Sequence, residues 1–358
     1  MGAGGLRRAA GRSRPQMMAT ADRTGRPVRG SWRMTALPAM IAATVVLCLS
    51  SVAVGTRTIG LADLLAGMQG ATDSIGQAAV AARVPRTLLA ALAGSALGLS
   101  GAIMQGVTRN PLADPGILGI NNGAALAVVI GIAWFQIGTA STYIWLAILG
   151  AGLTAVFVYA IGSVGRGGAT PLKLALAGAA TSVAFSSLTL AIVLPRNDIA
   201  GGVRSWQIGG VGGATWDRIE LVLPVLLIGA AIAMMSARKL NLLALGDDLA
   251  AGLGEKVAFA RGMASLGAIM LCGAATAICG PIGFVGLVVP HLCRLLFGVD
   301  HRWLLPCSAL AGAALLILSD VIGRLIARPS ELDVGIVTAF VGAPFFIWIV
   351  RRQRVRDL

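Results

Sequence analysis

Eight long stretches of this 358-residue sequence contain no Asp, Glu, Lys or Arg. They cover residues 34–56, 87–108, 115–165, 174–195, 221–237, 262–293, 303–319 and 334–350. An α-helix that crosses a lipid bilayer needs about 20 consecutive, mostly apolar residues, and it satisfies its own backbone hydrogen bonds. The stretches therefore predict an all-α integral membrane protein, because water-soluble domains carry about twice the 12% of charged residues found here.

Two of these stretches decide the number of spans. The stretch 115–165 is long enough for two helices, with a break expected near 136–143, where polar and small residues cluster. Glycine and proline between residues 280 and 283 interrupt the stretch 262–293, which is either one helix or a helix followed by a short, broken return limb. Ten spans with both termini in the cytoplasm place more of the 29 lysines and arginines on that side than nine spans do. We therefore expect about ten transmembrane helices.

The charge distribution divides the sequence into three parts. Residues 1–35 form a basic cytoplasmic tail that we expect to be disordered, residues 36–350 form the transmembrane domain, and residues 351–358 form a cytoplasmic C-terminal tail. The net charge of +14 follows from this topology, because a basic tail faces anionic cytoplasmic lipid. The charge therefore predicts contact with membrane lipid and no nucleic-acid partner.

Sequence motifs for the usual chemistries of an enzyme or a pump are absent. The sequence has no GxxxxGK[ST] phosphate-binding loop, no HExxH zinc motif and no GxSxG nucleophile, so we expect no enzyme activity and no metal site. Asp320 and Glu331 lie close to the ends of spans, whereas ion-coupled carriers usually keep charged residues at the bilayer midplane. An ion-coupled secondary transporter is therefore the remote alternative. If the protein pumps a solute, we expect the energy to come from another chain.

Several motifs follow one another in a set order along the chain. They are RVPR at 83–86, QGVTRNPLADPGILG at 105–119, NNG at 121–123, LALGD at 243–247, LG at 253–254, GPIGFVGLVVPH at 280–291, DHR at 300–302 and GAPF at 342–345. Together they closely resemble the FecCD-type permease family, the membrane subunits of ABC importers for ferric siderophores, haem and cobalamin. The resemblance covers roughly residues 56–350.

The resemblance implies a type II ABC importer permease fold with ten helices in the bacterial cytoplasmic (inner) membrane. It implies four kinds of partner: a second permease subunit, identical or paralogous; two cytoplasmic ABC ATPase subunits; a periplasmic or lipid-anchored substrate-binding protein; and membrane lipid. ATP and Mg are then used by the partner ATPase, with no cofactor on this chain. Residues 108–119 resemble the siderophore branch most, so a ferric siderophore is the expected substrate, with haem or cobalamin as the alternative.

Residues 238–262 are the longest internal cytoplasmic loop, and glycines at 246, 252 and 254 divide it into two short helical patterns. Its leucines form an apolar surface, which usually marks a partner when it is exposed to water. An intramolecular cover is the alternative. The resemblance makes this loop the coupling element that docks into a groove of the ATPase subunit. The implied coupling residues are Leu243, Ala244, Leu245, Gly246, Asp247, Ala250, Leu253 and Gly254.

A cytoplasmic gate between two subunits is also implied by the resemblance. Its first segment is the turn 109–116, where Pro111 and Pro115 prevent continuation of the preceding helix. The match at the second segment is looser. The implied gate residues are Asn110, Leu112, Thr170, Pro171 and Leu172. The alternative is that the turn simply connects two spans.

Three arginines are expected on the outer side, against the trend of basic residues toward the cytoplasm. Arg83 and Arg86 also precede a helix, where the macrodipole disfavours cations. Contact with lipid headgroups is one interpretation. The resemblance instead implies that Arg83, Arg86 and Arg324 dock carboxylates of the substrate-binding protein, since arginine grips a carboxylate with two donors. Asp320 and Arg324 lie four apart, which predicts an intrahelical ion pair.

Hydroxyl side chains gather in the fifth span, at about 172–194. They are Thr181, Ser182, Ser186 and Thr189. A hydroxyl-rich helix fits a wet pathway better than lipid, and the resemblance places this helix beside the translocation path at the dimer axis. These four residues are therefore predicted to line the pathway.

Small residues recur in the second span. Gly94 and Gly98 are four apart, and Gly101 adds a third glycine to the same helix. Such spacing lets two helices approach closely. The three glycines therefore predict close helix packing.

Overall fold

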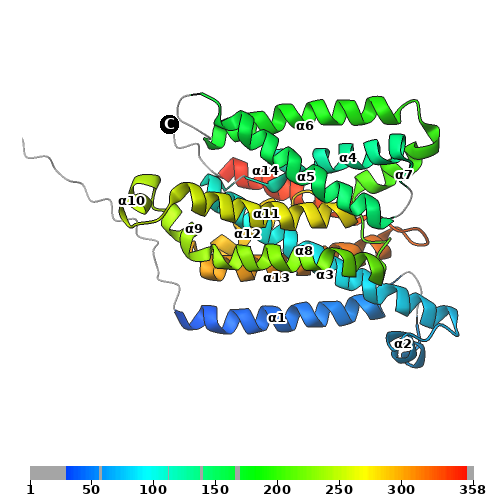
Figure 1. Ribbon diagram of the computed structural model, residues 1–358. Coiled ribbons are helices and arrows are strands. Elements are labelled where there is room, and N and C mark those ends of the chain that lie inside the picture. The colour runs from blue at the N-terminus through cyan, green and yellow to red at the C-terminus, as the bar shows by residue number, and fades with distance from the viewer. Residues whose placement is uncertain (1–29, 56–58, 112, 138–139, 166–169, 353–358) are drawn as a thin grey trace, which may run out of the picture.

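The computed structural model describes residues 30–55, 59–111, 113–137, 140–165 and 170–352, which form α-helices, one short 3-10 helix and their connections (Figure 1). Ten of the helices are apolar and make up the bundle. Seven of them are long enough to cross a membrane: α1 (Gly30–Ala53), α3 (Ile75–Thr108), α5 (Ala140–Ser163), α6 (Pro171–Val193), α8 (Trp216–Met235), α11 (Val257–Cys279) and α13 (His301–Ile326). Three are shorter: α4 (Ile120–Phe135), α12 (Val285–Phe297) and α14 (Val334–Arg352). The expected ten-helix membrane fold is confirmed.

The remaining elements are short; η1 lies inside the bundle, and the other four lie at its two ends. They are α2 (Leu61–Met68), η1 (Pro115–Leu118), α7 (Asn197–Ile208), α9 (Ala237–Leu243) and α10 (Asp247–Gly252). Figure 1 shows α9 and α10 together at one end, which we call the coupling end, and α2 and α7 at the opposite end, which we call the outer end. The coupling end is the one that the sequence places in the cytoplasm.

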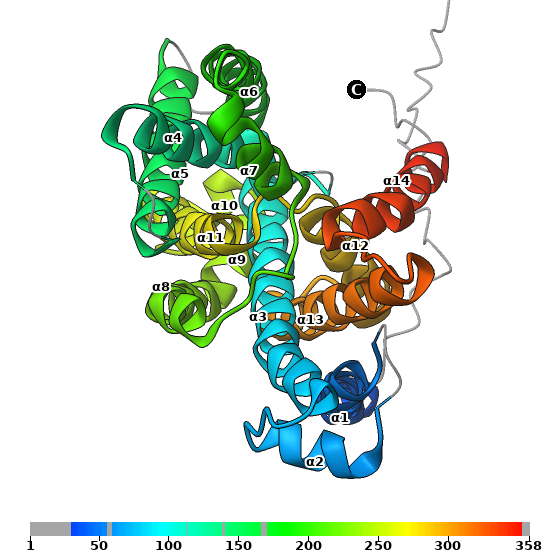
Figure 2. The same cartoon turned by 90° about the vertical axis from the view of Figure 1, so that its right-hand side faces the viewer.

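Helix α3 lies at the centre of the bundle and packs against α13, α11 and α12 (Figure 2). Its glycines make this possible. A Cβ atom on Gly94 would lie 2.3 Å from the carbonyl oxygen of Gly312 in α13, and one on Gly101 would lie 2.0 Å from the carbonyl oxygen of Gly286 in α12. The glycines therefore let backbones touch, and the predicted packing role is confirmed.

Helices α4 and α12 are too short to span a bilayer alone. At 1.5 Å per residue, their 16 and 13 residues reach about 24 and 20 Å, against a hydrocarbon core of about 30 Å. Each follows an interruption of the α-helical path: the 3-10 helix η1 precedes α4, and residues 280–284 precede α12. The interrupted stretch 262–293 thus forms a helix and a separate return limb, and the stretch 115–165 divides between Phe135 and Ala140 as expected.

Candidate functional site

The coupling loop folds into α9 and α10 as the glycine pattern predicts. Gly246 separates the two helices with φ of +113°, a conformation that side chains with a Cβ atom rarely adopt. The sharp turn places Leu245, Leu249 and Leu253 at the surface, with 55%, 62% and 64% of each residue exposed. Leu249 lies within α10, and Leu245 and Leu253 lie in the turns on either side of it; we call these three exposed leucines the leucine ridge.

Two of the predicted coupling residues face inward. Leu243 and Ala250 are fully buried in this chain, so the expectation that both are presented to a partner is wrong in this conformation. Each is a core residue that holds its short helix against the bundle. Leu249 was missed from the sequence, although its four-residue spacing from Leu245 and Leu253 is the signal that identifies it.

Asp247 ties the coupling loop to two transmembrane helices. Its carboxylate forms ion pairs with Arg109, at the C-terminus of α3, and with Arg261 of α11, the latter at 2.8 Å from Nη2 to Oδ1. The Arg109 Nε atom also donates to the carbonyl oxygen of Leu243 at 2.7 Å. Because Arg109 directly precedes Asn110, the coupling loop is joined to the first gate segment through side chains of this chain alone.

A second set of hydrogen bonds anchors α9 to the start of α13. The Asn241 amide donates to Asp300 Oδ1 at 2.7 Å, and the backbone N–H of His301 donates to Asn241 Oδ1 at 2.9 Å. Burial alone would raise the pKa of Asp300, but hydrogen bonds from the Arg302 N–H and the Asn241 amide outweigh it and lower that pKa below its usual value. The ionised carboxylate therefore holds this junction together.

The two predicted gate segments lie side by side at the coupling end. A small cavity of about 30 Å³, lined by Asn110 and Asp114 of the first segment, is also lined by Leu174 and Ala175 in the first turns of α6. Thr170 caps α6 by accepting a hydrogen bond from the Lys173 N–H at 3.4 Å. Pro171 is the first residue of α6 and Leu172 is exposed, whereas Leu112 lies outside the described residues. The gate role of these residues stays a prediction.

Two of the three outer arginines, Arg83 and Arg324, cap the C-terminus of α1. Arg83 Nη1 donates to the carbonyl oxygens of Val52 and Ala53, both at 3.3 Å. Arg324 Nη1 donates to the carbonyl oxygens of Ser51 at 3.0 Å and Val54 at 2.8 Å. The final carbonyls of a helix lack partners within it, and a cation there also interacts favourably with the macrodipole. Arg324 lies in the last turn of α13, where a cation is favourable for its own helix as well. Arg83 and Arg86 lie well inside α3, which begins at Ile75, so the expectation that they precede a helix is wrong.

This arrangement corrects the expected exposure of the three arginines. Arg83 is 7% exposed and Arg324 is 1% exposed, so neither can contact a headgroup or a partner protein in this conformation. The Arg86 side chain is 14% exposed, and its Nη1 atom lies 2.5 Å from Oε2 of Glu331 at the surface. Docking of a binding protein stays a prediction. Of the three arginines, Arg86 is the one with an accessible side chain, and Glu331 beside it is also accessible.

Asp320 of α13 is fully buried and forms ion pairs with two arginines, one in its own helix and one in α3. Arg324 Nη2 lies 3.0 Å from Oδ2, which confirms the intrahelical pair, and Arg86 Nη2 of α3 lies 2.7 Å from Oδ1. The second partner lies 234 positions away in the sequence, and nothing in the local pattern indicates it. We call Arg86, Asp320 and Arg324 the outer ion triad.

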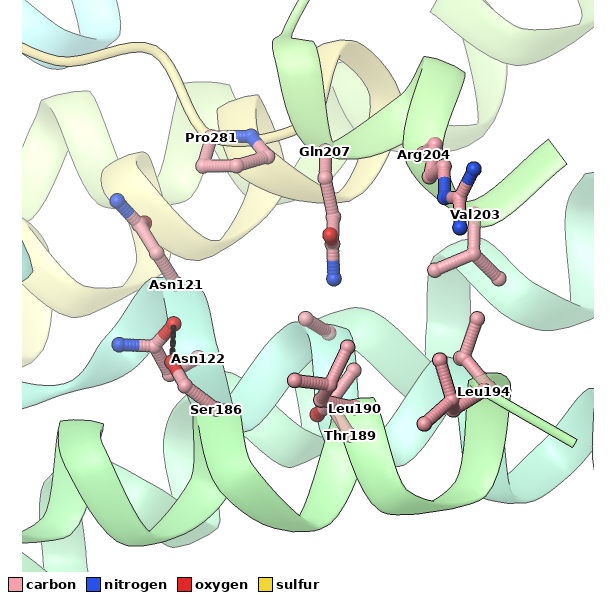
Figure 3. A pocket seen from close by; sticks show the side chains of 12 residues that line it. Asn121, Asn122, Ser186, Thr189, Leu190, Leu194, Val203, Arg204, Gln207 and Pro281 are labelled. Atoms are coloured by element: carbon pink, nitrogen blue, oxygen red, sulfur yellow. Dashed lines mark hydrogen bonds between the residues drawn. The ribbon is translucent and has the colours of Figure 1, made fainter. Parts of the chain in front are cut away.

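A polar pocket of about 380 Å³ lies between α4, α6 and α7 (Figure 3). Its lining residues are Asn121, Asn122, Ala125, Ser186, Thr189, Leu190, Val193, Leu194, Val203, Arg204, Gln207 and Pro281. We call it the α6–α7 pocket. Of the four predicted pathway residues, Ser186 and Thr189 line it. Ser182 is half-buried beside Gly119, and the Thr181 hydroxyl donates to the Ala177 carbonyl at 2.7 Å within α6, away from this pocket.

Four polar residues of the pocket lie outside the predicted pathway set: Asn121, Asn122, Arg204 and Gln207. The asparagines begin α4, directly after the break at Gly119, and two polar residues at the start of an otherwise apolar span are a usable signal. Arg204 and Gln207 lie on one face of α7, and no sequence motif marks them as pathway residues. Their approach to α6 depends on the turn between the two helices.

The ten-helix bundle with its short α4 and α12, a coupling loop at one end and a pocket between α4, α6 and α7 defines a multi-span membrane permease. The FecCD transport family matches residues 43–352 of the chain, which therefore belongs to this family. It is 46% identical over 272 residues to the iron(3+)-hydroxamate import system permease protein FhuB of Bacillus subtilis, an alignment covering 76% of this chain and 71% of that protein.

Two further comparisons cover more of the chain. The ferric enterobactin transport system permease protein FepD of Escherichia coli is 42% identical over 322 residues, covering 90% of this chain and 96% of that protein. A structure described as an inward-facing conformation of a metal-chelate type ABC transporter superposes with a TM-score of 0.77 at 29% identity, covering 90% of this chain and 100% of the other. The chain is therefore an ABC importer permease subunit without an ATPase site of its own, and partner chains hydrolyse ATP.

Proposed function

We propose that this chain carries a ferric siderophore across the bacterial cytoplasmic membrane. It works as one of two permease subunits, identical or paralogous, with two ATPase subunits at the coupling end and a substrate-binding protein at the outer end. The observation that carries the substrate assignment is the order of similarity: relatives named for hydroxamate and enterobactin transport are 46% and 42% identical, against 39% for a hemin permease of Yersinia pestis. Haem transport is the second candidate within the same family.

The chemistry of the α6–α7 pocket also favours an oxygen-rich chelate. Its polar side chains are amides, hydroxyls and one guanidinium, which suit a ligand that presents carboxylate, hydroxamate or catecholate oxygens. In the described chain, no histidine or cysteine lines this pocket to ligate a haem iron.

The linkage at the coupling end suggests how ATP drives transport. When the ATPase subunits close, they displace α9 and α10 through the leucine ridge. Asp247 transmits the displacement to Arg109, and thus to the gate segment that begins at Asn110. Movement of this segment against the start of α6 opens or closes the cytoplasmic end of the path.

Deletion of the gene in its native host tests the substrate, because the natural ATPase and binding protein stay in place. Uptake is measured with ⁵⁵Fe as hydroxamate, catecholate and citrate chelates, with labelled haem and with labelled cobalamin, before and after complementation with a plasmid copy. We expect loss of uptake for at least one ferric siderophore, restored by the plasmid, and unchanged haem and cobalamin uptake. Loss of haem or cobalamin uptake with all siderophores unaffected overturns the assignment.

A further inference from the structure

We infer that the α6–α7 pocket binds a negatively charged oxygen group of the transported chelate within a single subunit, with Arg204 as the cation that selects it. This inference rests on the proposed function, since it names the part of the substrate that the pocket takes. Such a site differs from a pathway that merely lets the chelate pass between two subunits, because it attracts one kind of chelate over another.

The first observation is the size of the pocket. Ligand pockets in proteins occupy about 300 to 1,000 Å³, and the α6–α7 pocket holds about 380 Å³. It is therefore large enough for one arm of a siderophore or for a small ferric chelate. Ser186, Arg204 and Gln207 are exposed, so the pocket opens to the surface of the subunit.

The second observation is a buried hydroxyl without a partner. Thr189 is 4% exposed and lines the pocket, and its Oγ1 atom has no hydrogen-bond partner among the described residues. Buried polar groups in folded proteins are nearly always hydrogen-bonded, so an orphaned one inside a cavity marks a place where a ligand or water completes the bond. The neighbouring hydroxyl of Ser186 already donates to Asn122 Oδ1 at 3.1 Å.

The third observation is the balance of charge in the lining. Arg204 is the one charged residue of the pocket, and it forms no ion pair with the described residues. Arg196, two turns earlier, instead pairs with Asp198 at 2.8 Å. Asn121 and Asn122 lie in the first turn of α4, where the helix macrodipole places positive potential. An anion entering the pocket thus meets a cation and a helix N-terminus and no carboxylate.

The fourth observation is that the lining offers donors. The Oδ1 atom of Asn121 accepts from Thr276 at 2.9 Å, and that of Asn122 accepts from Ser186, so both asparagine oxygens already serve this chain. The Gln207 side chain points into the open space, and Arg204 reaches toward the same space from one side (Figure 3). A ligand that accepts hydrogen bonds fits this lining better than one that donates them.

The test measures binding to the purified full-length permease in lipid nanodiscs, by equilibrium dialysis with two ⁵⁵Fe probes. One probe is a triply anionic ferric tris-catecholate and the other is an uncharged ferric trishydroxamate. The variants are Arg204→Gln, Arg204→Lys and Thr189→Val, and Arg196→Gln is the matched control, because it removes a cation of the same outer segment outside the pocket. Elution of each variant as a single species in gel filtration confirms folding.

We expect the anionic probe to bind the wild type and to lose about tenfold or more in affinity in Arg204→Gln, since a charge-assisted hydrogen bond is lost. Arg204→Lys should bind the anionic probe more tightly than Arg204→Gln does. Thr189→Val alone should weaken binding relative to the wild type by a smaller factor than Arg204→Gln, and Arg196→Gln should bind like the wild type. The uncharged probe responds weakly to Arg204→Gln. Equal affinities of wild type and Arg204→Gln for the anionic probe, or no binding to the wild type, overturn the inference.

The two proposals fail in different ways. If the gene supports siderophore uptake in its host but the purified permease does not discriminate by charge, the pocket inference is wrong and the transport function stands. If deletion of the gene leaves every siderophore unaffected, the transport function is wrong whatever the pocket binds.

Discussion

Neutralising the buried carboxylate of the outer ion triad should destabilise the bundle at the junction of α1, α3 and α13. Asp320→Asn keeps the shape of the side chain but removes the charge that faces Arg86 and Arg324. The Arg324 side chain is 2% exposed and that of Asp320 is 0% exposed, so water cannot replace the lost partner. Arg86 is partly accessible and can turn toward Glu331, to which it already binds.

The magnitude follows from these contacts. Removal of one partner from a buried ion pair costs about 3–5 kcal/mol, because the other charge stays buried without compensation. Arg324 retains its hydrogen bonds to the carbonyl oxygens of Ser51 and Val54, and Arg86 retains Glu331. We therefore expect a loss near the lower end of that range, about 3 kcal/mol.

The assay is unfolding of the purified permease in mixed micelles of increasing SDS content, followed by tryptophan fluorescence. Asp198→Asn is the matched control, because Asp198 pairs with Arg196 at the surface, with 60% of the Asp198 side chain exposed. The control should unfold like the wild type. If Asp320→Asn also unfolds within about 1 kcal/mol of the wild type, the triad does not hold the three helices together as described.

Three further predictions concern packing, coupling and pH. Gly101→Ala should lower stability by about 1–3 kcal/mol in the same assay, because the new Cβ would lie 2.0 Å from the Gly286 carbonyl, whereas Gly152→Ala, with open space, should not. Leu245→Asp should abolish transport and co-purification of the ATPase while membrane insertion is unchanged. Normal co-purification and transport in this variant would show that the leucine ridge is not the surface that docks to the ATPase. Because folding lowers the pKa of Asp300, its ionised form stabilises the α9–α13 junction above about pH 4 and that contribution disappears as pH falls through the folded pKa. The stability difference between wild type and Asp300→Asn should therefore vanish in acid, and a difference that persists there contradicts the assignment.

The sequence by itself determined the helical framework, because each part of it depends on local properties of the chain. Apolar stretches of bilayer length form spanning helices wherever they occur, and the breaks fall where glycine, proline and polar residues cluster, although single prolines such as Pro85 and Pro306 lie inside helices. The division of residues 115–165 and the two short helices around Gly246 were predictable on this basis, whereas the sequence left open whether residues 262–293 form one helix or a helix and a return limb. The packing role of Gly94 and Gly101 followed from their spacing alone.

Only the tertiary structure decided which polar groups meet. Arg86 pairs with Asp320, and Arg83 caps α1, across separations of 234 and about 30 positions that no helical period relates. The sequence places these arginines near the outer boundary of a span, but their exposure depends on which neighbouring helix ends beside them. The same holds for the α6–α7 pocket, whose hydroxyls and Arg204 come together through the turn between two helices. Periodicity fixes the face of one helix, whereas a buried ion pair or a pocket needs the relative placement of several, which is set by the packing of the whole bundle.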